Sequence, residues 1–302
     1  FLESEVIRKT GKRIDLADIY PVRCALIDKG ETYVRLHGGL SWGEGGAFHD
    51  VINMYAKYGA MPQHLYSGIQ YDSKINNFGE LQAVLEGFLK GIVSNKSGKL
   101  SPIWKTSFQN LVDAYLGTPP TEFEYENKKY TPKSFATEYL KLNPADYFEI
   151  TSFTHMPYYR KSLFLVPDNW SFDHIWNVQM TELTDIIDHA LKSGTTVAWA
   201  GDVSEKYFSW KNGVAYVPDT MPEDPRDEKY DAQMKALFDG PKTEKKITPE
   251  LRQKSFDNYE TGDDHGMHIV GLAKDQSGRE YYMVKNSWGE KNDHKGYIYM
   301  SK

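Results

Sequence analysis

The first half of the chain alternates apolar and polar residues at the spacing of amphipathic helices. Residues 1–9 predict a short helix that Gly11 ends, and a second helix is predicted to open at Asp15. One face of that second helix carries apolar residues at positions i, i+4, i+8 and i+11, namely Leu16, Tyr20, Cys24 and Ile27. Pro21 is expected to kink this helix or end it early.

Further helices follow at intervals. A Gly-rich loop at 41–46 precedes a helix that Gly59 closes, and residues 81–92 predict another amphipathic helix. Residues 117–150 hold four prolines among polar residues, which indicates loops with short helices. Ser171 is predicted to cap a long helix that ends at Gly194.

The last third of the chain shows the pattern of β-strands. A short buried strand is predicted at 195–200, and further strands at 268–273, 281–285 and 296–300. A turn at 275–278 joins the first two of these last strands, which should therefore form a hairpin. Helices first and an antiparallel sheet last predict an α+β fold rather than alternating βαβ units.

Composition narrows the classes of protein to which this chain can belong. The chain has 302 residues, a formal net charge of -6 and 40% hydrophobic residues, which is typical of a globular protein. The acidic balance argues against nucleic acid as the main partner, and no apolar run approaches the ~20 residues of a membrane span. One cysteine, Cys24, allows no disulfide within the chain. The 21 Tyr and 7 Trp residues leave a carbohydrate-binding module open as an alternative.

Candidate chemistry gathers at the predicted hairpin. His268 opens its first strand and Asn286 follows its second, so the two side chains are predicted to be neighbours. An Asn carbonyl can fix the tautomer of an imidazole and leave the other ring nitrogen free to exchange a proton with a nucleophile. Trp288 can shield that hydrogen bond from water.

Three motifs in this order resemble papain-like cysteine peptidases: Trp-Gly-Glu-Gly-Gly at 42–46, a histidine on a strand, and Asn-Ser-Trp-Gly at 286–289. The long middle region is similar to the bleomycin hydrolase and aminopeptidase C family. The resemblance implies a single domain over 1–302, with a helical left part (1–70), a family-specific helical insertion (about 71–165) and a β-rich right part (about 166–302). It implies His268 and Asn286 as catalytic, Gly45, Gly46 and Met267 as substrate-binding, and Trp288 as supporting.

The resemblance also carries functional expectations. It implies hydrolysis of peptides through an acyl-enzyme, aminopeptidase action, a hexameric assembly and a cytoplasmic location, with no metal or organic cofactor. A periplasmic or exported location stays open, because the chain lacks an initiator Met. The family's nucleophilic Cys, its oxyanion Gln and its C-terminal tail have no counterpart here. Residues 1–9 look like the continuation of the helix that carries the Cys, which would lie roughly 11 Å upstream.

Several alternatives accompany these expectations. Cys24 lies on an apolar stripe without a family motif, so we interpret it as a buried and inert thiol. His265, beside Asp263 and Asp264, is interpreted as support for the catalytic loop or as a solvated residue, although a metal site is conceivable. A catalytically inactive homologue that only binds peptides remains the main rival.

Overall fold

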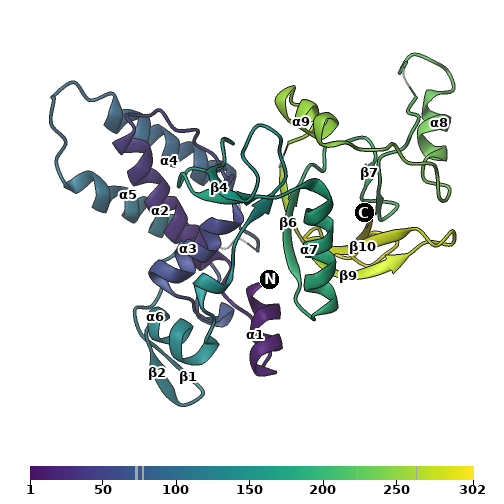
Figure 1. The fold of residues 1–302 in the computed structure, drawn as a ribbon. Coiled ribbons are helices and arrows are strands. Elements are labelled where there is room, and N and C mark those ends of the chain that lie inside the picture. The colour runs from purple at the N-terminus through teal and green to yellow at the C-terminus, as the bar shows by residue number, and fades with distance from the viewer. Residues whose placement is uncertain (72–73, 77, 223, 263) are drawn as a thin grey trace. The chain divides into compact units, whose positions relative to one another are not determined.

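The computed structural model describes residues 1–302 except 72–73, 77, 223 and 263 (Figure 1). The chain divides into two compact units. We call residues 2–149 and 161–175 the helical unit, and residues 1, 150–160 and 176–302 the sheet unit. The division predicted from the family, into a helical part (1–70), an insertion (about 71–165) and a β-rich part (about 166–302), stays a prediction.

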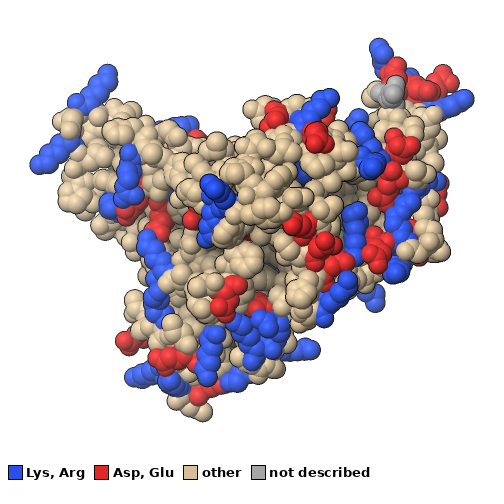
Figure 2. Space-filling view, viewed as in Figure 1, with Lys and Arg blue, Asp and Glu red and all other residues tan. Residues whose placement is uncertain are grey.

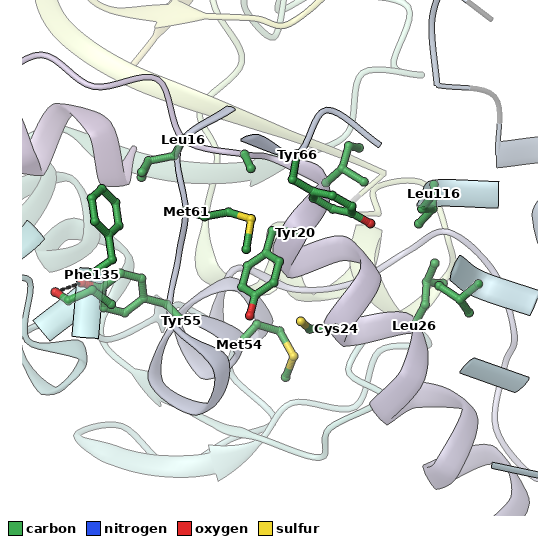
Figure 3. Packing of buried hydrophobic residues seen from close by; sticks show 14 of the residues in the cluster. Leu16, Tyr20, Cys24, Leu26, Met54, Tyr55, Met61, Tyr66, Leu116 and Phe135 are labelled. Atoms are coloured by element: carbon green, nitrogen blue, oxygen red, sulfur yellow. Dashed lines mark hydrogen bonds between the residues drawn. The ribbon is translucent and has the colours of Figure 1, made fainter. Parts of the chain in front are cut away.

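In the helical unit, α2 contacts α3, α4 and α5, which lie around it in Figure 1. Its longer elements are α1 (Leu2–Thr10), α2 (Ile19–Arg35), α3 (Phe48–Tyr58), α4 (Phe78–Val93), α5 (Ile103–Leu116) and the antiparallel pair β1 (Phe123–Tyr125) and β2 (Lys128–Tyr130). Single turns complete it: η1 (Gln63–Leu65), α6 (Pro132–Ser134), the π-helical η2 (Phe135–Leu140) and η3 (Pro144–Asp146). The apolar faces of these elements form one continuous core (Figure 3).

In the sheet unit, α7 packs on a six-stranded sheet of order β6-β9-β10-β11-β8-β7 (Figure 1). The sheet consists of β6 (Val197–Gly201), β7 (Phe208–Ser209), β8 (Val214–Ala215), β9 (His265–Lys274), β10 (Glu280–Lys285) and β11 (Tyr297–Ser301). Its helices are α7 (Met180–Lys192), α8 (Tyr230–Ala236) and α9 (Pro249–Asp257). A small sheet of order β3-β5-β4 is formed by β3 (Ile150–Thr151), β4 (Arg160–Leu163) and β5 (His174–Asn177).

Most predicted elements are present. The helices predicted at 1–9, after the Gly-rich loop and at 81–92 are α1, α3 and α4. Gly11 and Gly59 take positive φ angles of 69° and 87° where α1 and α3 end, which is the conformation that favours glycine there. The predicted hairpin is β9–β10, and its turn is closed by a bond from the Gly278 amide to the Asp275 carbonyl.

Four predictions of local structure are wrong. The second helix begins at Ile19, and Pro21 lies in its first turn, where a missing N–H costs nothing, so α2 continues to Arg35. The helix predicted from Ser171 begins only at Met180, because residues 174–177 alternate between exposed and buried and form β5. Residues 123–130 form a hairpin instead of a loop, and β9 begins three residues before the predicted strand.

The surface charge is mixed on the face drawn in Figure 2. Lys and Arg side chains lie interspersed with Asp and Glu over most of the elements visible there. This agrees with the nearly balanced content of 36 basic and 42 acidic residues. None of the helices in the described part of the chain is both long and apolar enough to cross a bilayer.

Candidate active site

The β9–β10 register decides which side chains share a face at the end of the hairpin. His268 pairs with Lys285, so these two point to the same side of the sheet. Asn286 follows Lys285 in the chain and therefore points to the other side of the sheet. Met267 precedes His268 and points to that same side, as does His265, two residues before Met267. The hairpin therefore brings Asn286 to His265 and not to His268.

The two side chains form a direct hydrogen bond, with His265 Nε2 2.7 Å from Asn286 Oδ1. The same oxygen accepts the amide of Ser287 at 2.7 Å. Because a backbone N–H can only donate, this second bond fixes which end of the Asn286 amide is the oxygen. His265 must then carry its proton on Nε2, and Nδ1 presents a lone pair that can accept one.

Aromatic rings cover this pair. The Trp288 ring centroid lies 4.9 Å from that of His265, and Trp210 and Phe208 pack edge-on against Trp288 at 5.3 and 6.3 Å. Asn286 is 6% exposed, whereas Trp288 is 43% exposed. An apolar cover lowers the local dielectric and strengthens the His265–Asn286 bond.

The glycine loop, residues 43–46, lies at the start of α3 in the helical unit. Gly46 is exposed, whereas the carbonyl oxygens of Gly43 and Gly45 both accept hydrogen bonds from Lys29 Nζ, at 3.0 and 2.9 Å. Within the described part of the chain, neither the amide nor the carbonyl of Gly46 has a hydrogen-bond partner. The loop thus leaves the N–H and the C=O of Gly46 available, and these two groups can pair with an extended chain.

Comparison with known proteins identifies the family of the chain. The model of the Peptidase C1-like family matches residues 28–302. The chain belongs to this family. It is 24% identical over 297 residues to aminopeptidase G of Lactobacillus delbrueckii subsp. lactis, with 89% of this chain and 62% of that protein covered. It is 26% identical over 286 residues to aminopeptidase E of Lactobacillus helveticus, with 85% and 60% covered.

A solved structure shows the same fold. PepW from Lactobacillus rhamnosis superposes with a TM-score of 0.71 at 18% identity, over 98% of this chain and 72% of that one. The predicted papain-like α+β fold is therefore confirmed, as is the resemblance to C1 peptidases. The chain spans about three fifths of the length of the two aminopeptidases it matches.

The prediction that His268 is the neighbour of Asn286 is wrong. An unbroken register from the Lys274–Glu280 pair would place His268 opposite Asn286, but the β-bulge at Met283/Val284 shifts the pairing by one residue, so that His268 pairs with Lys285. His268 lies on the opposite face, its ring 5.9 Å from that of Phe1, and its Nε2 is buried without a hydrogen-bond partner among the described residues. Burial is the main cause that lowers the pKa of His268 to about 4, so the ring is a weak base.

Met267, predicted to bind substrate, lies in the core of the sheet unit and is 4% exposed. It packs in one cluster with Ile269 and Val284, the apolar residues of the same sheet face. Its predicted contact with substrate stays a prediction, and what the structure shows is that it packs into this core from the strand that carries His265. The sequence signal for His265 was this alternation, because 265, 267 and 269 share one parity.

Cys24 is buried, as its apolar stripe predicts. It is 2% exposed and lies in the helical core near Tyr20 and Met54 (Figure 3). Burial raises the pKa of its thiol to about 11. A nucleophilic thiol needs the opposite environment, accessible and near a positive charge or an imidazole.

The conceivable metal site around His265 has no support from its described members. Asp264 uses its carboxylate to accept the amide of Val203 at 2.9 Å, and Asp263 lies outside the described residues. Among the residues that the structure describes, no group of three or more His, Cys, Asp or Glu side chains could hold a metal ion.

Proposed function

We propose that this chain carries the imidazole–amide part of a cysteine peptidase active site, with His265 as the catalytic base and acid. The observation that carries this proposal is the hydrogen bond from His265 Nε2 to Asn286 Oδ1, an oxygen that also accepts the amide of Ser287. It leaves Nδ1 as the nitrogen that can take a proton. Asn286 is a positioning residue, and Trp288 excludes water from the bond between them.

The proposed reaction is hydrolysis of a peptide bond in two stages. Nδ1 of His265 takes the proton of a thiol, and the thiolate attacks the carbonyl carbon of the substrate. The imidazolium then returns this proton to the leaving amine, and the C–N bond breaks to give a thioester. In the second stage His265 takes a proton from water, hydroxide adds to the thioester carbonyl, and the thiol leaves with the proton.

We propose that the attacking thiol belongs to a part of the protein outside these 302 residues. Two observations support this: Cys24 is the single cysteine and is buried, and the aminopeptidase relatives are longer than the match. The substrate is a peptide, held through the exposed main chain of Gly46. Because aminopeptidases G and E are related to this chain, we propose aminopeptidase action. The hexameric assembly and the cytoplasmic location stay predictions.

The test uses the full-length gene product and an aminoacyl fluorogenic substrate. His265→Ala should lower kcat by at least about 10³-fold, because no neighbouring group can replace the proton transfer. His268→Ala, three residues away on the other face of the same strand, is the matched control and should keep kcat within about threefold. Thermal unfolding of both variants separates catalysis from folding.

Three outcomes would contradict the proposal. Near-normal turnover by His265→Ala would remove its assigned role, and a loss of activity in His268→Ala alone would restore the sequence-based assignment. Absence of turnover in the wild-type gene product, with peptide binding retained, would favour the inactive homologue.

A further inference from the structure

Lys29 is a buried cation in the helical unit that the proposed mechanism does not use. It lies on α2 and is 3% exposed. Its ammonium donates to the carbonyl oxygens of Gly43 and Gly45, and lies 5.8 Å from the centroid of the Trp42 ring. A buried lysine is costly unless its charge is compensated, so this arrangement calls for a reason.

Two carboxylates of the same unit compensate the charge. Burial lowers the pKa of Lys29, while the nearby charges of Asp168 and Asp50 oppose that effect. Asp50 also accepts the amide of Ala47 at 2.8 Å, so it holds the residue that follows the glycine loop. The loop is thus fixed from both sides by side chains of opposite charge.

The geometry separates the roles of the two adjacent glycines. A Cβ on Gly45 would lie 2.0 Å from Asp168 Oδ1, so the backbone there is held between Lys29 and Asp168. A Cβ on Gly46 would lie 3.0 Å from Asp50 Oδ2, and the N–H and C=O of this exposed residue bond to none of the residues that the structure describes. Gly45 is therefore the anchored residue, and Gly46 is the one left available.

We propose that Lys29 is a positioning residue for peptide binding. Lys29 draws the carbonyls of Gly43 and Gly45 inward, and because a peptide group is trans, the N–H of Gly46 then points away from Lys29, in a fixed conformation that an extended peptide can pair with. A loop without this anchor must be ordered each time a peptide binds, and that ordering weakens the affinity. This inference rests on the proposed peptide-binding function of the loop.

The test has two arms in the full-length protein, and Lys29→Met is the main variant. Hydrogen exchange should accelerate at residues 43–47 by about tenfold or more, with other segments of the helical unit unchanged. Binding is measured in a His265→Ala background with a fluorescein-labelled tetra-alanine peptide, so turnover does not interfere. The Kd of this peptide should be roughly tenfold higher with Lys29→Met than with Lys29 in the same background. Lys90→Met, an exposed lysine of α4, is the control and should change neither quantity.

Gly45→Ala serves as a second variant if Lys29→Met does not fold, because it disturbs the same anchor while keeping the cation. It should also raise both the exchange rate and the Kd. Faster exchange with an unchanged Kd would overturn the inference, since the loop would then be anchored without serving peptide binding. Unchanged exchange would overturn it as well. Neither result touches the assignment of His265, which the turnover assay tests separately.

Discussion

His265 and His268 lie three residues apart on one strand, yet their surroundings differ in every respect that matters for chemistry. His265 has one ring nitrogen fixed by Asn286 and the other open, under a partly exposed indole. His268 has a buried Nε2 without a partner among the described residues, and its pKa is lowered to about 4. The histidine that we propose as catalytic thus differs from His268 by the bond that orients its ring, more than by its place in the sequence.

The difference arises from the pleat of the sheet. An offset of three residues reverses the side of the strand on which a side chain lies, so one histidine shares the face of Met267 and the other that of Lys285. The β-bulge at Met283/Val284 keeps the pairing of the strand end in the register that places Asn286 on the His265 side. Changes at Asn286, at His268 and at Cys24 in the core of the helical unit test this contrast, in the order of decreasing expected effect.

The largest effect after loss of His265 itself is expected at Asn286. In the full-length protein, Asn286→Ala should lower kcat by about 10- to 10³-fold, because the imidazole loses the acceptor that fixes its tautomer. Asn286→Asp keeps an acceptor oxygen at the same position and should retain more activity than the alanine variant. The pH profile of kcat/KM is measured for each, together with thermal unfolding. Equal kcat values for wild type and Asn286→Ala would show that His265 needs no orienting partner.

The sequence predicted a histidine next to Asn286 at the end of the hairpin, but it assigned this position to the wrong histidine. Apolar spacing located α1, α3, α4 and the β9–β10 hairpin, because these elements each bury one regular face. It failed at residues 174–177, where Ile175 and Trp176 also fit a helical stripe, and where pairing with β3 and β4 decides for a strand. The β-bulge at Met283/Val284, which no local pattern shows, is the reason that the histidine next to Asn286 is His265 and not the predicted His268. The bonds of Lys29 were beyond sequence reasoning, since no local pattern shows which carbonyls a buried ammonium meets.

A smaller effect is expected from substitution of His268, which should change how the unfolding free energy depends on pH. Its folded pKa, about 4, lies below the ordinary value of about 6.5, so the folded state favours the neutral ring. The contribution of the neutral His268 ring to the unfolding free energy is complete above about pH 6.5 and is lost as the pH falls through about 4. In His268→Gln the decline of the unfolding free energy over this window should be shallower. His174→Gln, at an exposed histidine of β5, is the control and should follow the wild type. A parallel decline in wild type and His268→Gln would contradict the assigned burial of the ring.

The smallest effect on activity is expected at Cys24, far from both histidines in the sequence and buried in the helical core. With a thiol pKa of about 11, about one molecule in ten thousand carries the thiolate at pH 7, and the sulfur is 2% exposed. Cys24→Ala should leave kcat and KM of the full-length protein within about twofold, and lower the unfolding free energy by about 1 kcal/mol through the small cavity it leaves.

Iodoacetamide should label Cys24 slowly in the folded protein and rapidly in guanidinium chloride, which would identify burial as the cause. Rapid labelling of the folded protein at neutral pH, or loss of turnover in a folded Cys24→Ala variant, would make Cys24 the nucleophile. The thiol that His265 serves would then have to be sought on α2, and the proposal that it lies outside these residues would fail.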